Sequence, residues 1–438
     1  MDIKQIMKEA GIVGAGGAGF PSYAKLSDGA NTLVINGAEC EPLLYTDYVI
    51  LKRELPSVVK GIKLVADYLK IKKSLLCIKD HTAKRLDFSD GQMLDEGVYI
   101  KVLPDVYPMG DEIGLIYQAT GRVVKPGNLP ITAGVIVYNV ETVYNVYNAY
   151  SKGENLIYKW LTVGGDIEKP FVVKVPIGVK VEDLFKKYSI LVPETHVVVD
   201  GGPSMGKIVN PDRAIVTKTT KSLLILPKNI PAIMAKQINA KMSVARAETA
   251  CCGCMRCTDI CPRNLLGYPI EPHKMVRTAM HAVELNPQMV ITASLCCNCG
   301  ICETLACNQG VSPKAVINEY KAVLAKNKLK YVATDDVEVS KERDYRMIPS
   351  TRWESILGVS KFDKIAEYIG ENYDFDEVRI STKQHIGAPS VPTVKVGDIV
   401  KIGDKIAESN DGLSLPQYSS IDGKVTSVSD EIIICKVN

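Results

Sequence analysis

Residues 251–262 read CCGCMRCTDICP, and residues 296–307 read CCNCGICETLAC. Four cysteines of the first stretch follow the spacing C-x2-C-x2-C-x3-C, and a proline comes directly after the last one. The second stretch repeats this pattern with one more residue before its final cysteine. Two cysteine triplets, each with a fourth cysteine behind it, are typical of a domain that holds two iron–sulfur clusters.

The spacing has a physical reason. Three thiolates two residues apart wrap one turn of backbone around a cubane, while the fourth reaches the neighbouring cluster. We therefore predict two [4Fe–4S] clusters. The ligands of the first are Cys251, Cys254, Cys257 and Cys307, and those of the second are Cys296, Cys299, Cys302 and Cys261. Structural zinc is the alternative, but a four-coordinate ion needs only two C-x2-C pairs.

Five cysteines remain outside the spacing pattern, two of them within the runs themselves. We expect them to be small buried thiols or neighbours of the ligands rather than ligands themselves. They are Cys40, Cys77, Cys252, Cys297 and Cys435.

Length and composition indicate a multidomain protein, because single cores stop growing well below 438 residues. The formal charge of +3 is too small to argue for nucleic acid or a membrane surface. We find no apolar run of the ~18 residues that a membrane helix needs and no secretory signal. A cytoplasmic protein with reduced thiols is expected, and exposed clusters would suit an anaerobic metabolism.

Residues 11–26 read GIVGAGGAGFPSYAKL, in which Gly14, Gly16 and Gly19 match G-x-G-x-x-G. A dinucleotide fingerprint follows a strand and opens a helix, whereas this loop follows a helix expected over residues 2–10. The glycines indicate that the backbone approaches a bulky group or adopts positive φ angles. A flat ring or a phosphate on the N–H groups is expected, with a flexible loop as the alternative.

A β-branched strand over residues 32–35 is followed by NGAECEP at residues 36–42. Polar groups at the carboxyl end of a strand are where α/β sheets place ligands. Helical and strand patterns then alternate through 55–69 and 74–79, as in an α/β domain. Residues 135–150 predict a strand that leads into a helix. Asn139 and Thr142 would lie at its N-terminus, where an anion such as a flavin phosphate is favoured.

Four motifs, GGAGFP, NGAECEP, YPMGDE and YNVET, occur in this order. Together they resemble the flavin and NADH domain that RnfC electron-transport subunits share with the flavoprotein subunit of respiratory complex I. The resemblance implies a Rossmann-like FMN/NADH domain over residues 1–158. It implies that FMN is held by Gly14, Gly16, Gly17, Lys25, Asn36, Glu39, Gly110, Asn139 and Thr142. It also implies NADH near Phe20, Glu41 and Glu112. Ala15 and Ala38 stand where the complex I flavoprotein has arginine and aspartate, so weaker nucleotide contacts are expected.

Four further parts complete the expected organisation, which is α/β and α+β with an all-β C-terminus. Residues 159–228 resemble the β-grasp module called SLBB, and residues 229–328 form an α-helical two-cluster ferredoxin-like domain. Residues 329–380 are a connecting segment. Residues 381–438 resemble a barrel-sandwich hybrid of the biotinyl and lipoyl class. No lysine flanked by acidic residues or methionine stands at a hairpin tip there, so an interaction or capping module is expected rather than a lipoyl carrier.

The order of these parts, with the segments MIPSTR and QHIGAP, resembles the PduS-type cobalamin reductases over essentially the whole length. This resemblance implies electron flow from NADH through FMN and two clusters to a corrinoid, with an adenosyltransferase as partner and a bacterial microcompartment as location. FMN is needed because hydride carries an electron pair and clusters accept single electrons. No catalytic acid or base is assigned. The alternatives are an RnfC-like subunit serving a ferredoxin or a terminal reductase, and a cobalamin carrier. No nucleic-acid partner is expected, and an oligomer is compatible with the sequence.

Overall fold

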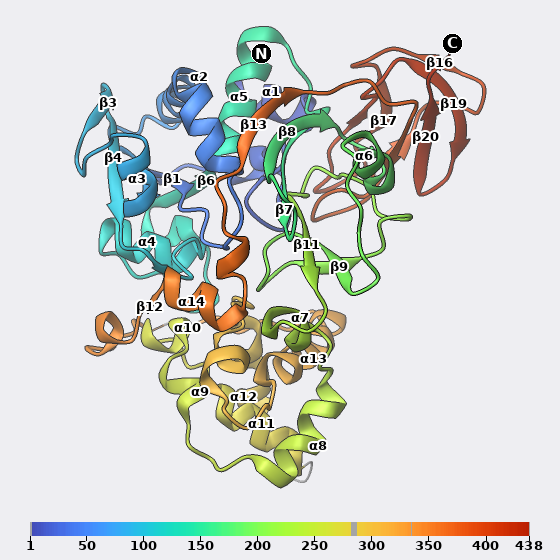
Figure 1. The fold of residues 1–438 in the computed structure, drawn as a ribbon. Helices are drawn as coiled ribbons and strands as arrows, with labels where there is room; N and C mark the ends of the chain where they lie inside the picture. Colours follow the sequence, from blue (N-terminus) through green and yellow to red (C-terminus); the bar gives the residue numbers. More distant parts are fainter. Residues whose placement is uncertain (1, 282–286, 334, 438) are drawn as a thin grey trace.

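Four parallel strands form the centre of the N-terminal domain (Figure 1). The structure, a computed structural model, describes residues 2–281, 287–333 and 335–437. The sheet order is β3-β4-β2-β1-β6, in which only β3 runs antiparallel to its neighbour. The strands are β1 (Thr32–Gly37), β2 (Ser74–Lys79), β3 (Met93–Asp95), β4 (Val98–Leu103) and β6 (Val135–Asn139).

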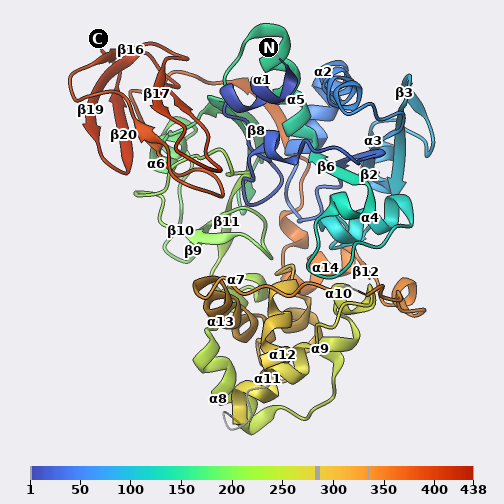
Figure 2. The ribbon, with the colours of Figure 1, turned by 180° about the vertical axis from the view of Figure 1, so that it is seen from behind.

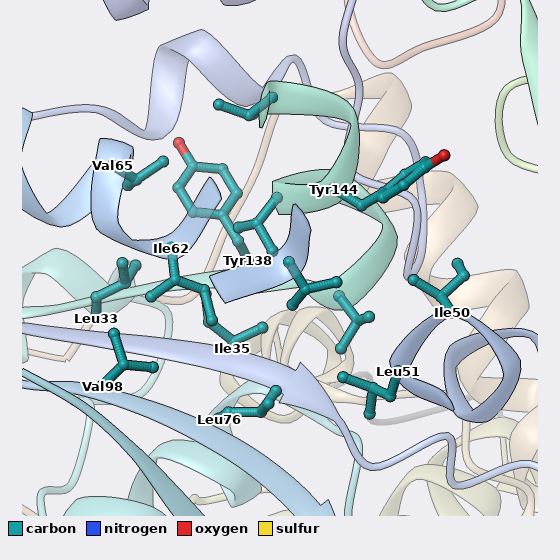
Figure 3. Close-up of a cluster of buried hydrophobic side chains, with 14 of the residues drawn as sticks. Leu33, Ile35, Ile50, Leu51, Ile62, Val65, Leu76, Val98, Tyr138 and Tyr144 are labelled. Carbon is teal, nitrogen blue, oxygen red and sulfur yellow. The ribbon is translucent and has the colours of Figure 1, made fainter. Parts of the chain in front are cut away.

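Helices cover both faces of this sheet. Leu33 and Ile35 pack in the core that contains residues of α2 and α5 (Figure 3). Val34 packs on the other face, in the core that contains residues of α4. Successive side chains of a strand point to opposite faces, so both faces must be apolar when both are covered. The helices are α1 (Ile3–Glu9), α2 (Thr46–Tyr68), α3 (Asp80–Arg85), α4 (Glu112–Thr120) and α5 (Val140–Lys152), with the short helices η1 (Ser22–Lys25) and η2 (Pro130–Ala133).

Helix α2 begins at Thr46, earlier than the predicted range of 55–69, and contains Pro56. The helix continues through the proline with a kink, and Glu54 has non-helical dihedral angles there. Proline lacks the N–H that the preceding turn would bind, which is the usual cause of such a kink.

A second, mixed sheet has the order β10-β9-β11-β7-β8-β13. Its last strand, β13 (Glu367–Glu371), pairs in parallel with β8. Residues 329–380 therefore do more than connect, because part of this segment completes the sheet. The other elements are β7 (Tyr158–Gly165), β8 (Phe171–Pro176), α6 (Val181–Lys187), β9 (His196–Asp200), β10 (Lys207–Val209) and β11 (Ser222–Pro227).

The two cysteine runs lie in a helical region at one end of the molecule (Figures 1 and 2). The helix expected over 232–247 is divided in two, because Asn239 caps a new helix by accepting a hydrogen bond from Met242 N. Of the helix expected over 272–285, residues 282–285 lie outside the described residues. The elements are α7 (Pro231–Lys236), α8 (Ala240–Ala250), α9 (Arg256–Asp259), α10 (Pro262–Leu265), α11 (Pro272–His281), α12 (Pro287–Ile291), η3 (Thr292–Leu295), η4 (Cys302–Ala306) and α13 (Pro313–Lys326).

The C-terminal part consists of two small sheets, β14-β20-β19-β16 and β15-β17-β18. Its first strand begins at residue 377, so the predicted limit at 381 cuts through it. Glu377 to Ser381 pair with β20 and belong to the barrel. The strands are β14 (Glu377–Ser381), β15 (Val391–Pro392), β16 (Ile399–Val400), β17 (Lys405–Glu408), β18 (Gln417–Tyr418), β19 (Gly423–Val428) and β20 (Glu431–Cys435).

Residues 343–362 lie between the first sheet and the helical region. Strand β12 (Ile348–Pro349) pairs with β5 (Val106–Tyr107), and α14 (Ser350–Leu357) follows it. The short helices η5 (Arg343–Tyr345) and η6 (Ser360–Phe362) flank this pair. Within the described residues, no helix combines the length and apolar character needed to cross a bilayer.

Candidate functional site

The glycine loop is closed at its base and open at its tip. Gly14 N donates to Phe20 O at 2.9 Å, and Val13 and Pro21 form a β-bridge beside this bond. Residues 16–18 are exposed at the tip. Among the hydrogen bonds of the described residues, none uses the N–H of Gly16 or Gly17, and no protein atom lies within 4 Å of a Cβ built on Gly17. The loop therefore offers free donors and free space, which fits a flavin or its phosphate.

Three predicted residues meet at the ends of β1 and β6. Asn36 Nδ2 donates to Gly110 O at 3.0 Å, and Asn139 Nδ2 donates to Asn36 O at 3.1 Å. Asn139 also caps α5, because its Oδ1 accepts from Glu141 N. A Cβ on Gly16 would lie 3.2 Å from Asn139. The structure thus brings the glycine loop against the strand ends, as the sequence predicts.

Thr142 and Lys25 fix the walls of this region. Thr142 Oγ1 accepts from Ala15 N at 3.0 Å, which attaches the glycine loop to the first turn of α5. Lys25 Nζ lies 2.8 Å from Glu112 Oε1 and donates to Val137 O at 3.0 Å. The side chains of this ion pair stay partly exposed, so Lys25 and Glu112 remain accessible to a ligand.

Glu39 lies at the start of α2. Its carboxylate accepts from Asp47 N at 2.9 Å and from Tyr48 N at 3.1 Å, as an acid at a helix N-terminus does. Burial and the nearby Asp47 charge raise the pKa of Glu39 to about 7, while Lys221 acts in the opposite direction. A buried charge network lies beneath this carboxylate.

Sequence reasoning missed that network. Lys221 donates to Asp47, and Lys159 pairs with Glu141 at 2.5 Å with both side chains almost fully buried. Both lysines come from the second domain, where they stand within or beside apolar strands. A lysine inside a buried strand is the signal that could have found them, since such a charge requires a partner.

Glu41 has partners of a different kind. Its carboxylate accepts from Ser204 N at 2.9 Å and from Met205 N at 3.1 Å. Tyr107 Oη lies 3.2 Å from Glu41 Oε1 and 2.7 Å from Cys299 O. None of these partners belongs to the glycine loop with which the sequence grouped Glu41. The residue instead joins the NGAECEP segment to the loop at 201–206.

The eight predicted ligand cysteines divide between two cavities. The first is lined by Cys251, Cys254, Cys257 and Cys307, and the second by Cys261, Cys296, Cys299 and Cys302. This is the partition that the spacing predicts. Among the remaining thiols, Cys77 is buried, while Cys252 lies beside the ligands of the first cavity and Cys297 beside those of the second.

Each cavity is lined by four of the predicted ligand thiols, which is the number that a [4Fe–4S] cluster requires. In the described part of the chain, no three His, Cys, Asp or Glu side chains are placed closely enough to hold a single metal ion. Burial raises the pKa of the Cys257 and Cys261 thiols to about 12, so a bound metal would be needed to hold them as thiolates.

The second cavity adjoins the segment at 107–112. Arg263, which lines this cavity, pairs with Asp111, and Tyr107 contacts the carbonyl of Cys299. The first cavity includes the exposed thiols of Cys252 and Cys254. The second cavity therefore lies next to the N-terminal domain that carries the glycine loop, called the glycine-loop domain below. The first cavity lies farther out, at the surface.

Comparison with known protein families finds a match for three parts of the chain. Residues 7–148 match the Nuo51 FMN-binding domain, residues 250–312 a 4Fe-4S dicluster domain, and residues 364–436 the RnfC barrel sandwich hybrid domain. Cobalamin reductase PduS of Salmonella typhimurium is 34% identical, over 99% of this chain and 96% of that protein. The chain belongs to the PduS family of cobalamin reductases. PduS of Citrobacter freundii is 33% identical over 98% of this chain and 95% of that protein.

A second group of relatives covers less of this PduS-family chain. One component of the proton-translocating ferredoxin:NAD(+) oxidoreductase complex of Clostridium ljungdahlii is 32% identical, over 59% of this chain and 55% of that protein. The matched domains make the chain an NADH-linked electron-transfer oxidoreductase whose cofactors are FMN and [4Fe–4S] clusters. The expected family and cofactors are thereby confirmed.

Proposed function

We propose that this protein reduces a corrinoid with electrons taken from NADH. The observation that carries the proposal is the sequence identity of 34% and 33% to two cobalamin reductases over nearly the full length of the chain. The matched range includes the cysteine domain and the C-terminal barrel. FMN supplies the conversion of a hydride into single electrons, which iron–sulfur clusters can carry. The order of the two cavities supports transfer from the glycine-loop domain through the second cysteine set to the first.

The residues of this chain have distinct tasks in the proposal. The free N–H groups of Gly16 and Gly17 and the N-terminus of α5 would bind the flavin and its phosphate. The full set is Gly14, Gly16, Gly17, Lys25, Asn36, Glu39, Gly110, Asn139 and Thr142.

On the nicotinamide side we retain Phe20 and Glu112. Phe20 O accepts from Gly14 N at the base of the glycine loop, and Glu112 pairs with Lys25 in a partly exposed ion pair. We assign Glu41 to the contact with residues 204 and 205, because its carboxylate already accepts their two N–H groups. Glu41 then acts on the interface between domains rather than on the dinucleotide.

Finer structural assignments belong to the same proposal. The doubly covered parallel sheet supports a Rossmann-like domain, and the mixed sheet with α6 supports a β-grasp domain of the SLBB type. The domain limits at 228 and 328 fall between elements of the structure, whereas the limit at 158 falls after the first residue of β7. The limits near 158 and 380 therefore need to move, to the starts of β7 and β14.

The proposal also includes the partners and the location. A corrinoid, or an adenosyltransferase that holds it, is the acceptor that agrees with the names of the full-length relatives. We place the reaction in the cytoplasm, with a bacterial microcompartment as the specific site. The sequence contains no D-x-H-x-x-G motif, so the corrinoid would be held without that histidine.

A second function is favoured by the C-terminal match to the RnfC barrel and by the identity to a component of a ferredoxin:NAD(+) oxidoreductase. In that case the chain passes electrons between NADH and a protein such as ferredoxin. The two functions share the flavin and the clusters and differ only in the acceptor.

The test is an anaerobic titration of the reconstituted protein with NADH, followed by hydroxocobalamin or by a ferredoxin. Flavin and cluster absorbance should bleach with NADH and return when hydroxocobalamin is added. Reoxidation by ferredoxin alone would overturn corrinoid reduction and support the second function. The Cys254→Ala variant serves as control, because it should accept electrons from NADH and lose transfer to the acceptor.

A further inference from the structure

The C-terminal barrel packs directly against the base of the glycine loop. Ile386 N donates to Gly19 O at 3.3 Å, and Tyr418 Oη donates to Glu9 O in the last turn of α1. Figure 2 shows the barrel strand β17 on the same side of the molecule as α1. Gly19, at one end of the loop, and helix α1, which precedes its other end, are therefore both held from outside their own domain.

Gly19 is where the contact is closest. A Cβ on Gly19 would lie 2.6 Å from Thr219 Cγ2 and 3.2 Å from Gln384 O, and its φ of +71° disfavours a side chain in any case. Gln384 and His385 of the QHIGAP segment thus form the wall behind this end of the loop. Glycine is needed here for the barrel to approach the backbone.

Gly11, at the other end of the loop, is held by Lys218. Lys218 Nζ donates to Gly11 O at 2.9 Å and lies 3.4 Å from Pro416 O in the barrel. The lysine is 2% exposed, and burial lowers its pKa to about 7. Both of these acceptors are backbone carbonyls, which makes the ammonium a bridge between the loop and the barrel.

Gln384 connects the two contacts. Its Oε1 accepts from Lys218 N at 3.0 Å, and its Nε2 donates to Gln417 Oε1 at 3.2 Å. Both glutamines are buried. A buried and satisfied amide pair fixes position well, because each lost bond would leave a polar group without a partner.

We propose that Gln384 and Lys218 are positioning residues through which the C-terminal barrel holds the glycine loop in its nucleotide-binding shape. This inference rests on the proposed function, since it assumes that FMN lies on that loop. It gives the barrel a structural role within this chain. A lipoyl carrier or a module that docks another protein would not need these contacts with the glycine loop. The N–H groups of Gly16 and Gly17 are then preorganised by contacts made at Gly11 and Gly19.

The experiment compares Gln384→Met and Lys218→Met with the control Lys405→Met in full-length, cluster-reconstituted protein. Lys405 lies at the same barrel surface and forms an exposed ion pair with Glu9. The dissociation constant for FMN should rise about tenfold or more in the first two variants and stay unchanged in the control. Iron content and the bleaching of the cluster absorbance by dithionite, neither of which requires the flavin, should equal those of the wild type in all three.

The outcomes separate the two proposals. Wild-type protein that takes up no FMN would overturn the proposed function itself. Stoichiometric FMN in the wild type with equal affinity in both variants would overturn the positioning role alone. Loss of iron together with FMN in Gln384→Met and Lys218→Met would also overturn it, since these residues would then support the whole fold rather than the loop.

Discussion

Arg263 Nη2 lies 2.7 Å from Asp111 Oδ1, and the two side chains are only 13% and 11% exposed. Asp111 caps α4 directly after Gly110, while Arg263 lines the second cysteine cavity. The pair therefore fastens the glycine-loop domain to the cysteine domain at the place where electrons would cross. A charge that is largely withdrawn from water depends strongly on its partner.

Asp111→Asn should weaken this junction. Asparagine can still cap α4, but Arg263 would lose its counter-charge, at a cost of about 3 kcal/mol in unfolding free energy. We expect a lower melting temperature and slower bleaching of the clusters by NADH in stopped-flow measurements. Asp80→Asn removes an exposed pair with Lys84 and should change neither quantity. Equal behaviour of the two variants would show that the buried pair does not hold the domains together.

Single cysteine variants should separate the two clusters. Cys254→Ala and Cys299→Ala should each lose half of the iron, because each removes a ligand from a different cavity. NADH should still reduce the remaining cluster in the Cys254 variant and stop at the flavin in the Cys299 variant. The measurement is iron content followed by electron paramagnetic resonance after NADH addition.

The matched control for this series is Cys252→Ala. Cys252 neighbours Cys251 and lies at the first cavity, yet the spacing excludes it from the ligands. This variant should keep all of its iron. Iron loss in it, or full iron in Cys254→Ala, would refute the predicted ligand sets.

Gly17→Val should reduce flavin affinity without harming the fold. No protein atom lies within 4 Å of a Cβ at Gly17, whereas a Cβ at Gly16 would already meet Asn139. The valine would occupy the open space that a flavin needs, so the dissociation constant for FMN should rise about tenfold or more. Fluorescence titration measures it, and the melting temperature of the flavin-free protein should stay unchanged.

Gly114→Ala is the control for that variant. Its added Cβ would lie 3.5 Å from Asp111, an ordinary contact inside α4. FMN affinity should equal that of the wild type. Full affinity in Gly17→Val as well would move the flavin away from this loop.

The features that could be predicted from the sequence are those that residues close together in the chain determine. The spacing of Cys251, Cys254 and Cys257 dictates which thiols share a cavity, because a few residues of backbone can reach only so far. The strand ends at Asn36 and Asn139 were likewise predictable, since parallel strands bring their carboxyl ends together.

What depends on contacts between distant segments was not predictable. Nothing in the local pattern of Lys221 indicates Asp47 as its partner, and nothing around Gln384 indicates Gly19. The same holds for β13, whose alternating burial is compatible with many partner strands besides β8. These contacts exist only because several domains pack together. The hydrophobic period of a segment indicates whether it forms a helix or a strand, but it does not indicate which other segment it packs against.

The raised pKa of Glu39 predicts a specific pH dependence. Its value is about 7 in the folded protein and near 4.5 as an ordinary carboxyl group. Between these values the unfolded chain has released the proton while the folded chain keeps it, so unfolding releases a proton and stability falls as pH rises. The contribution of Glu39 is therefore fully present below about pH 4.5 and lost as pH passes about 7.

Glu39→Gln removes this titration and keeps an oxygen that can accept from Asp47 N or Tyr48 N. The melting temperature of the variant minus that of the wild type should increase from about pH 5 to about pH 7 and level off above. The measurement uses flavin-free protein, because a ligand bound to the folded state would add its own stabilisation. Parallel melting curves across this range would mean that Glu39 is already ionised at pH 5, with the Lys221 charge outweighing burial.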